Sequence, residues 1–266
     1  MFLCNQNSTN VMTSPIVMEL KEKNHNYLSH ISLDCVVFGF HSNQLKVLVL
    51  HMKTTGEWAL PGGFVPEDES IEVAANRVLK KRTGLDEIFL RQFNVFSEPQ
   101  RSNRNPAVVD LLLSGQNYPE ASWFDQRFIS IGFYALVEFS QVQPQPDELS
   151  DICEWVNLEE IGRLILDHNT ILNKALETLR LQLTFQPIGY NLLSEKFTMS
   201  ELRKLYETIL GKELDRRNFQ RKILAYDILI RLDEVRQGVA HKAPGLYKFN
   251  LDNYQKALEE GLNGRW

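Results

Sequence analysis

Apolar residues concentrate in two neighbouring segments near the start of the chain, and both segments predict strands. Ile31–Phe40 and Leu45–Met52 contain continuous apolar runs, which indicate strands buried in the core of a sheet. The four residues His41–Gln44 between them suit the turn of a hairpin. Further strands are predicted at Ile88–Phe96 and Arg127–Phe139, so we expect a sheet in the first half of the chain.

Helical periodicity appears after the first pair of strands. Over Ser70–Arg82 the apolar residues fall on one broad face, and Gly84 then stops the helix. A short helix is predicted near Leu158–Leu166 and a longer one over His168–Leu183. The stretch Ser97–Gln126 is rich in Asn, Pro, Ser and Gly, and a connection of that length is usually functional or mobile.

Two amphipathic helices joined by a tight turn are predicted near the C-terminal end. Thr198 and Glu201 have the spacing of a capping box, and an apolar stripe at helical spacing follows them. Gly211–Leu214 supplies a short turn, and Asp215 is a suitable N-cap for a second helix over Arg216–Ala225. This is the order of a helix-turn-helix, whose second helix enters the major groove of DNA.

Two strands predicted after these helices are typical of a wing. Leu229–Leu232 and Gly245–Phe249 flank the segment Gln237–Pro244. The second helix directs arginine and glutamine away from its apolar face, and these residue types read base edges and bind phosphates. A solvated basic face without DNA is the alternative. The candidate DNA contacts are Arg216, Arg217, Asn218, Gln220, Arg221 and Lys222 on the helix and His241 and Lys242 near the wing tip.

Charge is distributed unevenly along the chain. Of the 266 residues 43% are hydrophobic and 24% charged, which is ordinary for a protein with packed cores, and the formal net charge is -5. Residues 187–266 carry 14 Lys and Arg against 11 Asp and Glu, whereas residues 1–186 carry 15 against 23. The asymmetry indicates that the C-terminal part meets an anionic partner.

The cysteines and the start of the chain bear on location. Cys4, Cys35 and Cys153 form neither a disulfide framework nor a metal-ligand spacing, which fits reduced thiols in the cytosol. The start is polar and Asn-rich, unlike a signal peptide, and no apolar run approaches the roughly 20 residues of a membrane helix. We expect a cytoplasmic protein without a membrane partner and a poorly ordered lead-in over residues 1–27.

The most specific motif lies between the predicted strands. Its residues are Gly63, Glu69, Arg77, Gly84 and Leu85, preceded by Trp58–Gly62. Their spacing matches the frame of a Nudix box, and the chain resembles the Nudix fold over roughly residues 28–166. The resemblance implies an α/β/α sandwich with a mixed sheet.

The helix of this motif departs from the hydrolases of that superfamily. They carry glutamates at the positions that match Val78, Lys81 and Arg82, where the spacing i, i+3, i+4 places three carboxylates on one face to hold Mg²⁺. Here that face carries an aliphatic side chain and two cations, which would repel a divalent metal. We expect no metal, no cofactor and no catalytic residue.

Three interpretations of the altered helix remain open. In the first, Glu69 and Arg77 persist as a structural ion pair and the helix is a scaffold. In the second, Lys81 and Arg82 bind an anionic ligand where the metal lies in the hydrolases. In the third, a metal binds through acidic residues that lack the usual spacing, namely Glu67, Asp68, Glu69 and Glu72.

The order of the two parts resembles the Nudix-related transcriptional regulators over about 240 residues. The segments that carry this likeness are Leu166–His168, Gln186–Gly189, Leu192–Leu193, Phe197–Thr198 and Asp215–Phe219. The resemblance implies a dimeric repressor or activator whose Nudix domain binds a small effector, ADP-ribose in one branch and a pentose such as arabinose in another. The connection Ser97–Gln126 is longer than the family pattern.

Candidate effector contacts are aromatic and charged residues of the first part. Aromatic rings stack on a ligand ring or sugar face, and core packing is the alternative for Trp58 and Phe64. Arg101 and Arg104 suit a phosphate or hydroxyls, and a solvated loop is their alternative. Asp34 lies in an apolar strand, so it needs a local partner or faces the pocket. His168 is expected to be a cap or packing group. The candidates are Asp34, Trp58, Phe64, Lys81, Arg82, Arg101, Arg104 and Trp123.

These observations predict an α+β protein with two domains. Residues 28–186 form a Nudix-like effector-sensing domain with a linker helix, and residues 187–266 form a winged helix-turn-helix domain. The predicted function is a homodimeric regulator that binds operator DNA and senses a small effector. Trp123, Phe124, Asn103 and Asn105 favour a sugar, as in the arabinose-type branch that regulates carbohydrate metabolism, and ADP-ribose is the alternative effector. The alternative functions are a Nudix-type pyrophosphohydrolase with an accessory domain and a protein-binding adaptor.

Overall fold

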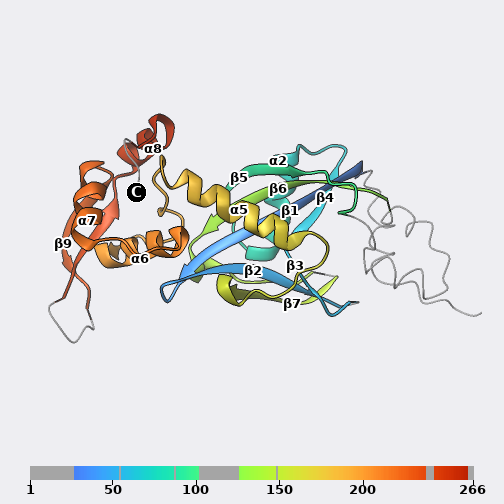
Figure 1. The fold of residues 1–266 in the computed structure, drawn as a ribbon, viewed down its shortest axis with the longest axis horizontal. Helices are drawn as coiled ribbons and strands as arrows, with labels where there is room; N and C mark the ends of the chain where they lie inside the picture. Colours follow the sequence, from blue (N-terminus) through green and yellow to red (C-terminus); the bar gives the residue numbers. More distant parts are fainter. Residues whose placement is uncertain are drawn as a thin grey trace, which may run out of the picture.

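The computed structural model describes residues 27–53, 55–86, 88–101, 126–147, 149–237 and 243–262. Two groups of elements follow each other along the chain, and helix α5 (His168–Gln182) runs between them (Figure 1). The predicted lead-in, apart from Tyr27, lies outside the described residues, as does most of the predicted long connection.

The first group of elements is built on a mixed sheet of seven described strands. Strands β1 and β6 are parallel, and the other pairs are antiparallel. The hydrogen-bonded order is β3-β2-β1-β6-β5, with β4 paired to β1 and β7 paired to β2. The strands are β1 (Tyr27–His41), β2 (Gln44–Met52), β3 (Trp58–Ala59), β4 (Gly62–Pro66), β5 (Phe89–Phe96), β6 (Ile129–Val137) and β7 (Ser150–Asn157).

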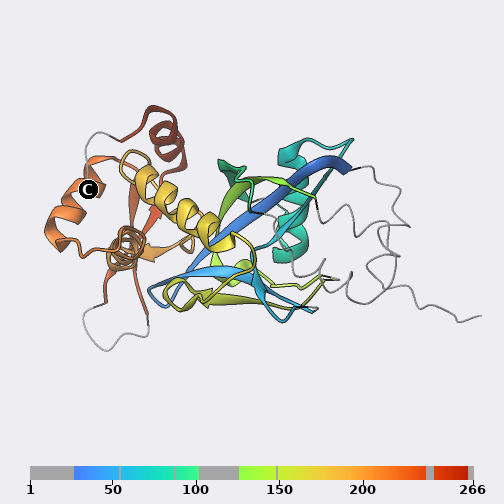
Figure 2. The ribbon, with the colours of Figure 1, turned by 45° about the vertical axis from the view of Figure 1, so that its right-hand side comes forward.

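Helices cover both faces of this sheet (Figures 1 and 2). Helix α2 (Ile71–Thr83) packs on one face and α5 on the other. Successive residues of β1 alternate between the two faces, so Val37 joins the core beneath α2 and Val36 and Phe38 join the core beneath α5. This arrangement is the α/β/α sandwich with a mixed sheet that the sequence predicts.

Several local predictions in the first group are confirmed. The hairpin between β1 and β2 turns at Ser42 and Asn43. Both residues have positive φ, as the two central residues of a type I′ turn require. Helix α2 is capped by the Ser70 side chain and ends at Gly84, whose φ of 74° is the left-handed conformation that glycine adopts without a Cβ penalty.

The helix predicted over Leu158–Leu166 is wrong. Only a single 3-10 turn, η2 (Leu158–Glu160), forms there, after strand β7. The following residues lie along β3 instead, because the Ile165 N–H donates to the Trp58 carbonyl at 2.8 Å and Leu164 bridges Trp58 in a parallel sense. A long-range backbone pairing therefore replaces the local helical tendency.

The second group of elements is a winged helix-turn-helix. Its elements are β8 (Phe197–Thr198), α6 (Met199–Leu210), α7 (Arg216–Ala225), β9 (Leu229–Val235), β10 (Gly245–Phe249) and α8 (Leu251–Glu260). The capping box of Thr198 and Glu201 and the N-cap at Asp215 are both present as predicted. Strands β8, β10 and β9 form an antiparallel sheet in that order. Helix α8 was not predicted.

The two groups share one apolar core. Leu176 and Leu179 of α5 lie in the same cluster as Tyr206 of α6 and Phe219 of α7. Polar contacts reinforce the junction, since Arg180 Nε donates to the Ile209 carbonyl at 2.7 Å. Helix α5 therefore packs against both the large sheet and the helix-turn-helix.

No helix within the described part of the chain is long and apolar enough to cross a membrane.

Candidate functional site

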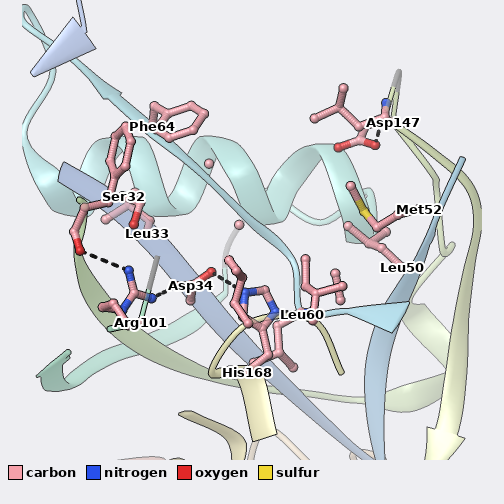
Figure 3. Close-up of a pocket in the computed structure, with 17 residues that line it drawn as sticks. Ser32, Leu33, Asp34, Leu50, Met52, Leu60, Phe64, Arg101, Asp147 and His168 are labelled. Carbon is pink, nitrogen blue, oxygen red and sulfur yellow. Dashed lines mark hydrogen bonds and ion pairs between the residues drawn. The ribbon is translucent and has the colours of Figure 1, made fainter. Parts of the chain in front are cut away.

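A cavity of about 190 Å³ opens where β1, β4 and the start of α5 meet (Figure 3). One part of its wall is apolar and includes Leu33, Leu60 and Phe64. The other part is charged and includes Asp34 of β1 and Arg101, which precedes the undescribed segment 102–125. The cavity thus combines an apolar surface with a buried charged group, as ligand sites usually do.

The charged wall is a hydrogen-bonded cluster centred on Arg101 and Asp34, and both residues are buried. Arg101 Nη2 donates to Asp34 Oδ2 at 3.3 Å, and Ser130 Oγ donates to the same oxygen at 2.5 Å. Arg101 also binds both carboxylate oxygens of Asp167, from Nε at 2.9 Å and from Nη2 at 3.0 Å. Asp34 therefore has local partners and also faces the cavity, which resolves the question that the sequence leaves open.

His168, the first residue of α5, completes this cluster (Figure 3). Its Nδ1 accepts a hydrogen bond from the Leu60 backbone N–H at 2.9 Å, so the proton of the neutral ring belongs on Nε2. Nε2 lies 3.4 Å from Asp34 Oδ1 and faces it. The buried ring packs against the end of β3 and ties α5 to the cavity.

The glycine pair at the start of β4 gives the backbone room to approach this cluster. A Cβ on Gly62 would lie 2.7 Å from the Leu33 carbonyl oxygen and 3.0 Å from Asp34 Oδ1. A Cβ on Gly63 would lie 2.8 Å from Val78 Cγ2 of α2. Glycine at both positions therefore lets β4 pair closely with β1 and pack on α2.

Aromatic rings line the cavity beside the charged cluster (Figure 3). Phe64 and Phe128 both line it, with their ring centroids 5.5 Å apart. Tyr27 packs edge-on against Phe64 at 5.9 Å. An aromatic wall next to a guanidinium suits a ligand that combines a planar ring with an anionic group.

Two of the three altered positions of α2, Val78 and Arg82, make internal contacts. Arg82 is buried and forms an ion pair with Asp147, whose Oδ1 also accepts from Ser150 Oγ at 2.6 Å. Val78 is buried against Gly63, and Lys81 is exposed. None of the three altered positions, Val78, Lys81 and Arg82, lines the cavity. Val78 and Arg82 are therefore part of the packing of α2 against its neighbours.

The remaining box residues form the predicted ion pair. Arg77 Nε donates to both oxygens of Glu69, at 3.0 and 2.9 Å, and Nη2 donates to the Phe64 carbonyl at 3.2 Å. This contact confirms the ion pair of the first interpretation and fixes the start of α2 to β4.

A basic face lies on the second helix of the helix-turn-helix. Phe219 and Ile223 are buried on one side of α7, and Arg217 and Arg221 are exposed on the other. Arg216 and Asn218 are also exposed, whereas Gln220 and Lys222 are half-buried. Burial, with Lys212 nearby, lowers the pKa of Lys222. His241 and Lys242 lie outside the described residues.

Comparison with protein-family models accounts for both groups of elements. The NUDIX domain model matches residues 28–179. The chain belongs to the NUDIX domain family. A second model, described as the NrtR DNA-binding winged helix domain, matches residues 189–249. The Nudix domain contains the cavity, and the winged helix domain contains the arginine face.

Two relatives match the chain over different lengths. The chain is 28% identical over 232 residues to the "ADPR responsive transcriptional repressor NtrR" of Acinetobacter baylyi, covering 84% of this chain and 83% of that protein. It is 33% identical over 101 residues to the "ADP-ribose pyrophosphatase" of Methanocaldococcus jannaschii, covering 34% of this chain and 60% of that one.

A solved structure extends the likeness to most of the fold. The crystal structure of Shewanella oneidensis NrtR complexed with a 27mer DNA superimposes with a TM-score of 0.68 at 26% identity, covering 85% of this chain and 96% of that chain. Together the comparisons support the Nudix-regulator family that the sequence predicts, but not its sugar-sensing branch.

The Nudix domain of this chain does not fit the divalent metal of the hydrolases. Val78 offers no oxygen, Arg82 and Lys81 are cations, and Glu69 is paired with Arg77. Among the described residues no group of three or more His, Cys, Asp and Glu side chains could hold a metal ion. The acidic residues of the third interpretation therefore form no such group within that part of the chain.

The structure brings together only part of the predicted effector site. Asp34, Phe64 and Arg101 line the cavity. Trp58 packs beside His51 with centroids 5.1 Å apart and is not part of the lining. Lys81 and Arg82 also lie away from the cavity, and Arg104 and Trp123 lie outside the described residues.

Three residues of the cluster were missed by sequence reasoning as effector-site residues. Phe128 and His168 line the cavity, and Asp167 binds Arg101. Sequence reasoning noted the segment Leu166–His168 for its resemblance to the regulators and expected His168 to be a cap or packing group. One signal could have pointed to part of the cluster: an aspartate buried in β1, Asp34, requires a cationic partner, and Arg101 is that partner.

Proposed function

We propose that this protein is a transcriptional regulator that binds operator DNA through its winged helix domain and responds to ADP-ribose held in its Nudix domain. The observation that carries the proposal is the likeness, over 84% of the chain, to a protein named as an ADPR responsive transcriptional repressor. The chain shares both domains of such a regulator, residues 28–179 and 189–249.

The chemistry of the cavity supports an ADP-ribose-like effector. Phe64 and Phe128 offer a face for a planar base, and Arg101 offers a guanidinium for a diphosphate. At about 190 Å³ the cavity is smaller than the roughly 300–1,000 Å³ of most whole-ligand sites, so part of the effector would lie beyond its mouth. A pentose would not need the arginine and the aromatic pair together.

The effector in this proposal replaces the predicted sugar. The loop residues that favoured a sugar, Asn103, Asn105, Trp123 and Phe124, lie outside the described residues. The described lining instead provides a buried guanidinium, which binds carboxylates here and binds phosphate in the same bidentate geometry. The relative that covers both domains is named for its response to ADPR.

DNA binding by the winged helix domain is supported by the arginine face of α7. Arg217 and Arg221 are exposed opposite the buried Phe219, so they are accessible to a major groove. The proposal includes the predicted division at residues 28–186 and 187–266, a homodimer that pairs two helices on two half-sites, and a cytoplasmic location.

Hydrolysis of the effector is not part of the proposal. The carboxylates that hold Mg²⁺ in Nudix hydrolases are replaced by Val78, Lys81 and Arg82. We therefore expect ADP-ribose to bind without turnover. Chromatography after incubation with ADP-ribose and Mg²⁺ or Mn²⁺ should show no AMP above background, and AMP formation lost in the Glu69→Gln variant would support the hydrolase instead.

Calorimetry on the full chain tests the effector. ADP-ribose should bind, and arabinose should not. The Phe128→Leu variant should bind ADP-ribose about 2- to 12-fold more weakly, because an aromatic pair is worth about 0.5–1.5 kcal/mol beyond its buried area. Phe139→Leu is the matched control, since Phe139 stacks on His41 outside the cavity. Binding of arabinose but not ADP-ribose would contradict the proposed effector.

A further inference from the structure

Helix α5 starts in an unusual way, because its N-cap residue does not cap it. The side chain of Asp167 makes no capping hydrogen bond. The N-cap residues of the other described α-helices, Ser70, Thr198, Asp215 and Asn250, each accept a hydrogen bond from a backbone N–H of their own helix. Aspartate is among the best N-cap residues, so another interaction holds its carboxylate here.

That interaction is the bidentate pair with Arg101. Both Asp167 oxygens accept from the guanidinium, at 2.9 and 3.0 Å. The preceding residue, Leu166, has φ 48°, a left-handed conformation that residues with a Cβ rarely adopt. Asp167 itself has φ -101° and ψ 17°, outside the extended conformation usual for an N-cap. The start of α5 is therefore held by Arg101 in an arrangement that local preferences do not favour.

Arg101 has a second possible partner in the cavity. Among the described residues that line it, Arg101 is the only arginine or lysine. Its Nη1 donates to the Phe128 carbonyl at 3.2 Å, and its Nε and Nη2 are used by Asp167 and Asp34. A diphosphate in the cavity needs the same planar set of donors, because guanidinium binds phosphate and carboxylate in the same bidentate geometry.

The far end of α5 reaches the winged helix domain. Over 15 residues the helix extends about 22 Å. Arg180 in its last turn donates to the Ile209 carbonyl at the end of α6, at 2.7 Å. Gln182 accepts a hydrogen bond from Tyr134 of β6, whose pKa is raised to about 12 by burial, so the phenol keeps its proton at neutral pH. A change at the start of α5 can thus be transmitted to the DNA-binding elements.

We propose that Arg101 exchanges partners when a diphosphate-bearing ligand binds, and that this exchange is the step that couples the cavity to DNA binding. Without ligand Arg101 holds Asp167. With ligand the guanidinium binds the diphosphate, and the freed Asp167 carboxylate turns to cap α5. The two arrangements compete for one cation, which makes the start of α5 a two-state element. The identity of the ligand rests on the proposed function, but the role of Asp167 does not.

The Asp167→Asn variant tests the exchange without any ligand. Asparagine caps a helix as well as aspartate does, but it forms no ion pair with Arg101. The ligand-free variant should therefore bind operator DNA as ligand-saturated wild type does, with its affinity shifted in the same direction. The variant should also bind ADP-ribose about 3- to 10-fold more tightly, because Arg101 has already lost the carboxylate with which the diphosphate competes. A merely destabilising substitution would not tighten ligand binding.

The matched control is Asp151→Asn, which makes the same chemical change at an exposed partner of His51 on β7. It should leave both affinities within 2-fold of wild type. The Arg101→Gln variant should bind ADP-ribose at least 10-fold more weakly. In this variant ADP-ribose should no longer change the affinity for DNA. Operator and ADP-ribose affinities of Asp167→Asn equal to those of the control would overturn the exchange.

The exchange and the proposed effector can fail separately. If wild type does not bind ADP-ribose, the proposed effector is wrong. The exchange then stands only if ligand-free Asp167→Asn still differs from the Asp151→Asn control in operator affinity by more than 3-fold. If wild type responds to ADP-ribose and ligand-free Asp167→Asn shifts operator affinity in the opposite direction, the effector stands and the exchange does not.

Discussion

At the scale of single residues, sequence reasoning identifies groups that need partners but not the partners themselves. Asp34 in an apolar strand and Arg101 in the predicted connection Ser97–Gln126 were both candidates, and the structure pairs them at 3.3 Å. Their other partners, Ser130 and Asp167, are 96 and 66 residues away from the residues they bind. The spacing of residues along a chain does not indicate such tertiary contacts, so Asp167 and His168 were missed as effector-site residues.

The close approach at Gly62 gives a residue-scale prediction. Gly62→Ala should lower the free energy of unfolding by about 1–3 kcal/mol, because its Cβ would lie 2.7 Å from a backbone oxygen that cannot move aside easily. Denaturant titration measures this difference. Gly162→Ala is the control, since nothing lies within 4 Å of its Cβ. Equal stability of the two variants would mean that β1 and β4 are further apart than described here.

At the scale of elements, the predictions that depend on local signals are confirmed. Caps, hairpin residues and stop signals placed α2, α6, α7 and the β1–β2 hairpin correctly. The predictions that fail depend on distant pairing. The region after η2 pairs with β3 rather than forming a helix. Strand β4 (Gly62–Pro66) was not predicted, because glycine and proline rarely mark a strand interior.

The capping box of α6 can be tested at this scale. Thr198→Ala removes the side chain that accepts from the Glu201 N–H at 3.2 Å, and should cost about 0.5–2 kcal/mol of unfolding free energy. Thr178→Ala, on the exposed face of α5, should change stability far less. A larger loss for Thr178→Ala would show that the box contributes little to α6.

The arginine face of α7 gives a second element-scale prediction. If the residue reads a base, Arg217→Ala and Arg221→Ala should each weaken operator binding by about 1–3 kcal/mol. If it contacts phosphate, the substitution should weaken binding to all DNA sequences by a similar amount. The log of affinity should fall with log salt by about 0.9 per phosphate contact. Lys256→Ala on α8, an exposed cation that pairs with Glu260, is the control. Unchanged affinity of the double arginine variant would place the DNA contact elsewhere.

At the scale of the whole molecule, α5 joins the two separately recognisable domains. Its start lies in the cavity cluster and its end packs against the helix-turn-helix in one continuous core. The sequence predicts the helix and both domains. It does not predict that the helix starts with an ion pair in place of a cap, because that pair joins segments 66 residues apart.

The assembly is also a prediction at this scale. One winged helix domain with a small excess of positive charge should bind a specific site weakly, so two copies on half-sites spaced by whole helical turns are expected. Light scattering at micromolar concentration should give twice the mass of one chain. A monomer both free and on DNA would contradict the homodimer.

The measurement that tests the central claim most directly is operator affinity with and without ADP-ribose. Fluorescence anisotropy with DNA from upstream of the protein's own gene should show a 5- to 150-fold change at saturating ADP-ribose, since coupling between sites is typically about 1–3 kcal/mol. The same factor must appear when ADP-ribose binding is titrated with and without that DNA. Identical operator affinity in the presence of bound ADP-ribose would contradict the account.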